Sequence, residues 1–251
     1  MQIVLLTALG VGGATVFGAL LGFSFKEMSH KFSDMILSFA AGVMLCAAVL
    51  GLIVPSVEMG GKFSVLVAVL GIFSGAAVLN MMDMLVPHLH RLSGSDIEEH
   101  SEKSKSINKV LLFVLAIAIH NLPEGIAAGV GFGTGNTSEA LTIALGIALQ
   151  NIPEGMVIIA PMLAVGMSKK KTLLIAMLTG VVEVIGTFLG YFAVAVSSAI
   201  LPFALSFAGG TMLYVISDEM IPETHHEGAR GVTYALLAGF CLMLIMDLYL
   251  G

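Results

Sequence analysis

The amino-acid sequence is dominated by long apolar runs that charged residues seldom interrupt. An α-helix of roughly 20 apolar residues crosses the hydrocarbon core of a bilayer. Helices satisfy their backbone hydrogen bonds internally, as lipid requires, and the runs lack the period-2 alternation of barrel strands. The runs lie at roughly 3–25, 32–55, 63–82, 107–133, 138–165, 172–198, 201–221 and 230–249. The sequence therefore predicts an all-α polytopic membrane protein with eight transmembrane helices in one bundle.

Composition supports a single transmembrane domain that covers the whole chain, residues 1–251. Hydrophobic residues make up 57% of the chain and charged residues only 11%, whereas soluble domains carry about a quarter charged residues. The first run lacks a preceding basic region and is long enough to span, so we interpret it as a helix and not a signal peptide. Cys46 and Cys241 both lie in apolar runs and predict no disulfide framework. The net charge of −6, without an extended basic patch, argues against nucleic-acid binding.

Basic residues predict the orientation of the chain. Ten of the 11 Lys and Arg residues lie in the connections between the first and second, third and fourth, fifth and sixth, and seventh and eighth runs, and only Lys62 lies on the other side. The positive-inside rule places those four connections in the cytoplasm and both termini outside. We therefore expect a multi-pass protein of the cell membrane with extracytoplasmic termini. Its longest cytoplasmic loop is expected at about 83–106.

Two segments in the middle of apolar runs repeat one polar pattern. His-Asn-Leu-Pro-Glu-Gly occupies 120–125, and Gln-Asn-Ile-Pro-Glu-Gly occupies 150–155. Positions i and i+4 share a helix face, so the first polar residue and the glutamate of each segment point the same way. The proline of each segment removes a backbone donor and is expected to kink its helix. A carboxylate at a helix centre costs on the order of 2.5–3.5 kcal/mol to insert, so two such helices indicate a functional site.

A third glutamate, Glu183, lies at the midpoint of the run at 172–198. Together the three helices supply candidate metal ligands at one depth: His120, Asn121, Glu124, Gln150, Asn151, Glu154 and Glu183. Met44, at the midpoint of the second run, is a further candidate. Nitrogen and oxygen ligands without clustered thiolates favour borderline or hard divalent ions over copper(I). Three carboxylates exceed the charge of one dication, and two ions bridged by Glu124 and Glu154 would match it better.

Structural roles compete with these assignments. His120 could be a hydrogen-bonded core residue, Glu183 could pair with a polar side chain, and the two asparagines could join helices. Met44 could simply fill space in the core. We interpret the glycines of the first run as a packing face, and Gly180, Gly186 and Gly190 as points where the sixth helix approaches its neighbours.

Charged residues near the helix ends are candidates for the path of an ion. Glu58 and Asp247 lie at the outer ends of the second and eighth runs, where they could attract cations or be ordinary solvated charges. Acidic and histidine residues on the cytoplasmic side could form an exit path or a metal-sensing surface, although a polar loop would equally account for them. These residues are Asp83, His88, His90, Asp218, Glu219, His225 and His226.

The paired segments at 120–125 and 150–155 resemble the metal-binding motifs in the fourth and fifth spans of the ZIP (Zrt/Irt-like) metal transporters, in particular the bacterial zinc-uptake and GufA-like branch. Segments 41–45, 83–90 and 217–222 look similar as well, so the resemblance covers essentially the whole chain. It implies eight spans with external termini, import toward the cytoplasm, and one helix bundle moving against another.

The resemblance also implies a binuclear site. One ion would be held by His120, Glu124, Gln150, Glu154 and Met44. The second would be held by Asn121, Glu124, Asn151, Glu154 and Glu183. Many family members have His in place of Gln150, and some have Asp in place of Asn151, so this chain offers one nitrogen ligand and one carboxylate fewer.

Two other classes of function compete with transport. An intramembrane metal-dependent hydrolase could use the same ligands, but the HExxH pair of a zincin-like protease and the GxSG-type serine motif are missing from the sequence. A proton-coupled carrier of organic solutes would need a basic partner for an anion. We therefore predict a transporter and no enzyme, with the bilayer and divalent ions as partners and no resident cofactor. Zn²⁺ is the expected cargo, with Fe²⁺, Mn²⁺, Co²⁺ and Cd²⁺ left open, as is a homodimer.

Overall fold

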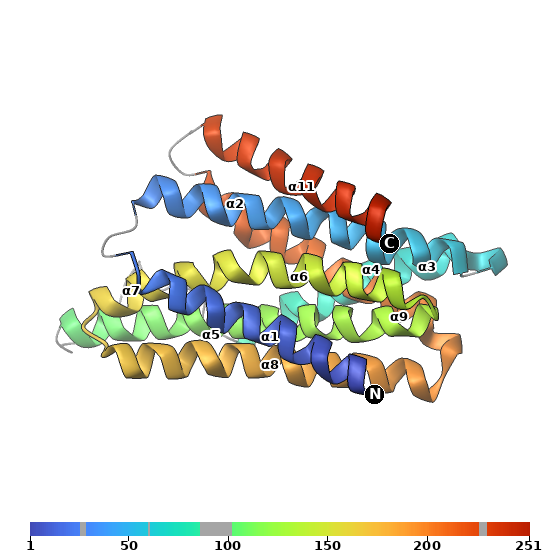
Figure 1. Ribbon diagram of the computed structural model, residues 1–251, viewed down its shortest axis with the longest axis horizontal. Coiled ribbons are helices and arrows are strands. Elements are labelled where there is room, and N and C mark those ends of the chain that lie inside the picture. The colour runs from blue at the N-terminus through green and yellow to red at the C-terminus, as the bar shows by residue number, and fades with distance from the viewer. Residues whose placement is uncertain (26–28, 60, 86–101, 226–229) are drawn as a thin grey trace.

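The structure is a computed structural model that describes residues 1–25, 29–59, 61–85, 102–225 and 230–251 (Figure 1). Every regular element in these ranges is a helix. The long helices are α1 (Gln2–Gly22), α2 (His30–Cys46), α4 (Ser64–Leu85), α5 (Glu102–Gly131), α6 (Thr137–Val157), α8 (Lys169–Val196), α9 (Leu201–Val215) and α11 (Arg230–Leu250). Shorter segments extend or join them: η1 (Ala47–Ile53), α3 (Val54–Met59), η2 (Gly61–Phe63), η4 (Phe132–Thr134), α7 (Ile159–Ala164), η5 (Ser198–Ile200), η6 (Ile216–Met220) and α10 (Ile221–Thr224).

Seven helical segments of the described chain are long and apolar enough to cross a membrane. They are Gln2–Gly22, His30–Met59, Gly61–Met82, Thr137–Ala164, Lys169–Val196, Leu201–Thr224 and Gly231–Leu250. Helix α5, with 30 residues, occupies the predicted fourth place in the series. The predicted all-α polytopic membrane fold is thus confirmed.

Helix ends differ from the predicted ends of the apolar runs. The predicted loop at about 83–106 is shorter, because α4 continues to Leu85 and α5 already begins at Glu102. The second helical segment, formed by α2, η1 and α3 in succession, is also longer than its apolar run and extends without a break from His30 to Met59. Hydropathy marks the part of a helix that meets lipid, whereas the helix itself continues into polar sequence on either side.

The long helices form two groups that pack against each other. The first group consists of α1, α5, α6 and α8, in which α5 packs on α8 and α1 packs on both α6 and α8. The second group consists of α2, α4, α9 and α11, in which α4 packs on α9 and α2 packs on α11. Contacts of α2 with α6 and of α5 with α9 join the two groups. Both chain termini lie at the end of the bundle that carries α3 (Figure 1).

Glycines allow the helices of the first group to approach one another closely. A Cβ atom on Gly12 would overlap the backbone of Gly180, and one on Gly18 would overlap a carbonyl of α6. Substitution of Gly186 or Gly190 would meet the backbone of α5 in the same way. The predicted packing roles of the glycines in α1 and α8 are therefore confirmed at these positions.

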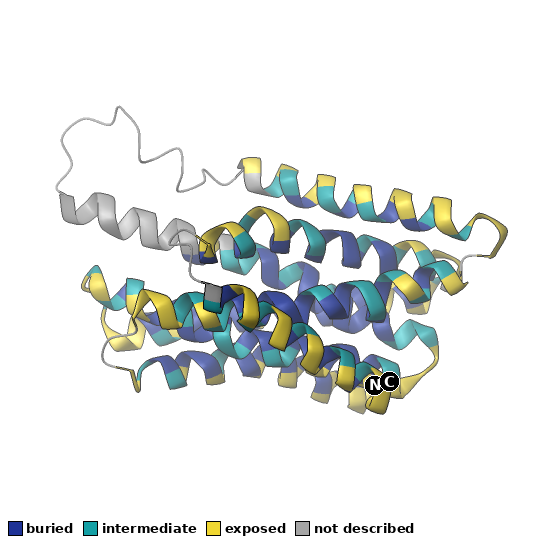
Figure 2. Ribbon diagram, turned by 90° about the horizontal axis from the view of Figure 1, so that it is seen from above, coloured by how far each residue is buried: buried dark blue, intermediate teal, exposed yellow. Residues whose placement is uncertain are grey.

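Large apolar side chains cover the outside of the bundle. Leu6, Phe73 and Tyr249 are among the most exposed of them. In the most apolar 18-residue stretch of Gly61–Met82 and of Gly231–Leu250, 22% is buried, whereas the buried share is 61% in His30–Met59 and in Thr137–Ala164. Figure 2 shows buried residues facing inward and exposed residues on the outer surfaces of the helices. This distribution suits a protein whose outer surface is solvated by lipid.

Candidate functional site

The two repeated segments lie inside α5 and α6, and both helices include their motif prolines. The polar side chains of both segments are buried, with Glu124, Gln150 and both asparagines at 0% exposure and Glu154 at 8%. Helix α6 also packs directly against α1 and α2. The polar residues of the repeat therefore face the interior of the bundle.

The glycine that ends each repeated segment fixes the neighbouring helix. A Cβ on Gly125 would overlap the carbonyl oxygen of Glu183 in α8, and a Cβ on Gly155 would overlap the carbonyl oxygen of Thr15 in α1. These close approaches bring the side chains of Glu183 and Thr15 to the same depth as the repeat.

The Glu183 carboxylate accepts hydrogen bonds from three other helices. Its Oε1 accepts from the Thr15 hydroxyl at 2.6 Å and from Asn121 Nδ2 at 2.5 Å. Its Oε2 accepts from Asn151 Nδ2 at 2.7 Å. We call Thr15, Asn121, Asn151 and Glu183 the hydrogen-bond hub.

Each asparagine of the hub uses its amide nitrogen twice. Asn121 Nδ2 also donates to the carbonyl oxygen of Thr179 at 3.3 Å, and Asn151 Nδ2 donates to the carbonyl oxygen of Val11 at 3.3 Å. The Oδ1 oxygens of both asparagines are buried and have no hydrogen-bond partner among the described residues. Both side-chain carbonyls are thus free to accept a ligand.

Next to the hub, a carboxylate and an amide are buried without partners. Both carboxylate oxygens of Glu124 and both polar atoms of Gln150 lack hydrogen bonds within the described structure. Glu124 interacts electrostatically with Glu154 and Glu183, and the Gln150 side chain is close enough to favour its charged form, although no hydrogen bond of good geometry joins the two. An unsatisfied buried polar group costs about 1–3 kcal/mol, and more when it is charged. Several together indicate a site that a ligand completes.

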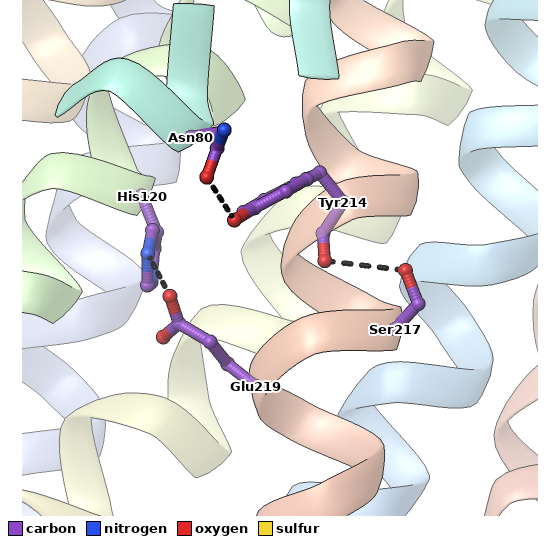
Figure 3. A network of polar contacts seen from close by, with 5 residues as sticks. All are labelled: Asn80, His120, Tyr214, Ser217 and Glu219. Atoms are coloured by element: carbon purple, nitrogen blue, oxygen red, sulfur yellow. Dashed lines mark hydrogen bonds and ion pairs between the residues drawn. The ribbon is translucent and has the colours of Figure 1, made fainter. Parts of the chain in front are cut away.

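His120 faces the second helix group. Its Nε2 lies 2.8 Å from Glu219 Oε1, and Glu219 belongs to the π-helical turn η6 (Figure 3). In the same region the Tyr214 hydroxyl lies 3.1 Å from Asn80 Oδ1, which links α9 to α4. A π-turn shifts the residues that follow it around the helix axis and often occurs at functional sites. Glu219, expected in the cytoplasmic exit path, is therefore in direct contact with His120.

The remaining candidates are not members of the hub. Met44 is fully buried and belongs to the same apolar cluster as Ala128 and Ile147. Glu58 is exposed at the end of the rod that continues α2, and Asp247 is half-buried near the amino end of α6, where it interacts electrostatically with Glu139.

On the predicted cytoplasmic side, few candidates can be placed. Asp218 is exposed, and His225 is exposed with its Nδ1 2.9 Å from the carbonyl oxygen of Ile221. Asp83 lies in α4, but its side chain is outside the described part of the structure. The residues His88, His90 and His226 are outside the described residues as well.

The donor set is mixed. In the described parts of the chain, no three His, Cys, Asp or Glu side chains gather tightly enough to hold a metal ion by themselves. A metal ion held by the carboxylates of Glu124 and Glu154 would therefore need amide oxygens as further ligands. Carboxylate and amide oxygens with one imidazole fit a divalent cation.

Comparisons with known proteins agree with the motifs. The family model described as the ZIP zinc transporter matches residues 87–247. The chain belongs to the ZIP zinc transporter family. It is 40% identical to the zinc transporter GufA of Myxococcus xanthus, with 98% of both chains covered. The zinc transporter ZIPB of Bordetella bronchiseptica is 35% identical, over 95% of this chain and 78% of that protein. A zinc transporter ZupT, from Chlorobaculum parvum, is 35% identical over 95% and 94% of the two chains.

The resemblance inferred from the paired motifs is thus confirmed, as is the multi-pass membrane character of this ZIP chain. Two contacts of the site were not anticipated from sequence. Thr15 was included in a helix interpreted only as a packing surface, although it is a buried polar residue between two packing glycines. The contact between His120 and Glu219 depends on the turn η6, which no residue pattern predicts.

Proposed function

We propose that this chain carries Zn²⁺ across the cell membrane into the cytoplasm through a mid-membrane site on α5, α6 and α8. The observation that carries the proposal is the buried carboxylate of Glu124, which has no hydrogen-bond partner among the described residues and lies beside the equally unpaired amide of Gln150. The relatives named as zinc transporters support Zn²⁺ as the cargo.

The proposed ligands of the transported ion are Glu124, Glu154, His120 and the amide oxygen of Gln150, with Met44 as a further candidate. A dication compensates the negative charge of two carboxylates, whose mutual repulsion is otherwise unopposed in a low-dielectric interior. A site made of shared carboxylates and one imidazole binds less firmly than the closed site of a structural zinc, and a transported ion must also leave.

Release involves the contact between His120 and Glu219. While the imidazole Nε2 is paired with Glu219 at 2.8 Å, that nitrogen is engaged with the carboxylate. Glu219 therefore competes with the ion for His120 Nε2. After the imidazole dissociates from Glu219, the freed carboxylate can bind the ion. This exchange gives Glu219 a place at the start of the exit path, ahead of Asp218 and His225.

The inward direction of transport rests on the family resemblance, whereas the orientation of the chain rests on its basic residues. The positive-inside rule places the end of the bundle with both termini outside the cell, so Glu58 and Asp247 would attract cations there. A shift of one helix group against the other would expose the site to each side in turn. The family resemblance also implies a second ion between Asn121, Asn151 and Glu183, which this proposal does not require.

Zinc uptake into proteoliposomes tests the function. Glu124→Ala and Glu154→Ala should each lower the uptake rate by tenfold or more, on the order expected when a charged ligand is lost. The matched control is Glu223→Ala, because Glu223 is an exposed glutamate of the short helix α10 that is not among the proposed ligands or path residues. Wild-type uptake by Glu124→Ala would contradict the proposed site. If the wild-type protein moved no metal into proteoliposomes, transport would be contradicted and the intramembrane metal-dependent hydrolase would be the better interpretation.

A further inference from the structure

The Glu183 carboxylate accepts three hydrogen bonds from the described residues, out of about four acceptor positions that a carboxylate offers. One hydroxyl and two amide groups, from α1, α5 and α6, donate to its two oxygens at 2.5–2.7 Å. These are the short distances of charge-assisted hydrogen bonds. Such donors compensate the buried charge of Glu183 without a cation, in contrast to Glu124, whose oxygens make no hydrogen bond of good geometry with the described residues.

The orientation of both asparagine amides is fixed by this arrangement. Each Nδ2 donates to Glu183 and to a backbone carbonyl, that of Thr179 or of Val11. If either amide rotated by half a turn, its Oδ1 would face a carboxylate and a carbonyl oxygen, and both hydrogen bonds would become repulsive contacts. The amide hydrogens therefore occupy, on each carboxylate oxygen of Glu183, an acceptor position that a second ion could otherwise use.

We propose that Glu183 is a positioning residue, held by Thr15, Asn121 and Asn151, and that this chain binds a single dication per transport cycle, at Glu124. The inference rests on the proposed function, in which Glu124 ligates the transported ion. The hub holds the free Oδ1 oxygens of the two asparagines turned away from Glu183, where they can complete the shell of that one ion.

Asn151 is the residue that decides the number of ions. An aspartate at this position has no N–H to donate, so its carboxylate would face the carboxylate of Glu183 at the distance of the present hydrogen bond. Two buried carboxylates so close together cannot both stay charged without a cation between them. With asparagine at position 151, a hydrogen bond to Glu183 takes the place that a cation would have to fill if the residue were aspartate.

The test counts Zn²⁺ bound to the purified full-length chain in detergent, by equilibrium dialysis followed by elemental analysis. Ions held by histidines elsewhere in the chain contribute equally to all variants, so differences between variants are compared. Glu124→Ala should bind one ion fewer than the wild type. A loss of two ions would overturn the inference but leave the transport site in place, whereas no loss would refute the site itself.

The second comparison examines the amide. Asn151→Asp should bind one ion more than the wild type, and Asn121→Asp should do the same if the first variant fails to fold. Glu183→Gln should leave the count unchanged while weakening zinc binding, because a positioning residue acts through the asparagines. Unchanged counts in both aspartate variants, or a count that falls by one in Glu183→Gln, would overturn the role assigned to the hub.

Discussion

Replacement of Thr15 by valine tests the hydrogen-bond hub by removing one oxygen at nearly constant volume. Thr15 is 1% exposed, and its hydroxyl donates to Glu183 Oε1 at 2.6 Å. A hydrogen bond to a charged group contributes about 1.5–3 kcal/mol to stability. For a chain of this size, each kcal/mol shifts the midpoint of thermal unfolding by about 2–4 °C, so Thr15→Val should unfold about 3–12 °C lower.

The assay is thermal unfolding of the purified protein in detergent, followed by circular dichroism. Thr211→Val is the matched control, because Thr211 is equally buried, at 2% exposure, but its hydroxyl donates only to the carbonyl of Ala208 in the same helix. Thr15→Ser keeps the hydroxyl and should recover most of the lost stability. If Thr15→Val unfolds no earlier than Thr211→Val, the hydroxyl does not support Glu183 and the reasoning fails.

Two further predictions follow from the site. Gly155→Ala would place a Cβ against the carbonyl oxygen of Thr15, and this overpacking should lower the free energy of unfolding by about 1–3 kcal/mol, which a lower unfolding temperature would show. Gly13→Ala is the control, because the new Cβ would meet open space and the change should be neutral or mildly stabilising. Equal effects of the two substitutions on the unfolding temperature would contradict close packing at Gly155. Zinc uptake should fall as external pH drops from about 7.5 to about 5, because protons compete with the ion for His120 and the carboxylates; a flat response in proteoliposomes would argue against direct ligation.

Local spacing made much of the site predictable from sequence. The i and i+4 positions of the repeat place His120 with Glu124 and Gln150 with Glu154 on single helix faces, and the structure buries all four. The depth of Glu183 followed from counting along an apolar run. These features depend only on the periodicity of a helix and the thickness of a bilayer.

Contacts that depend on how helices are paired could not be predicted in this way. Thr15 reaches Glu183 only because α1 packs beside α8 at a particular register, set by close backbone approach of Gly12 and Gly180. Glu219 reaches His120 from the π-turn η6, which no residue pattern announces. The same limit applies to helix ends, since polar residues extend α4 and α5 past the lipid-facing sequence.

The division of the helices into two groups separates the proposed ligands unequally. All four members of the hub, together with Glu124, Gln150 and Glu154, belong to α1, α5, α6 and α8. Met44 and Glu219 come from the other group. Movement of one group against the other would therefore leave most of the proposed ligands in place around the ion and change only the contacts with Met44 and Glu219. The affinity for the ion would then differ between the two positions of the groups, although most ligands stay together.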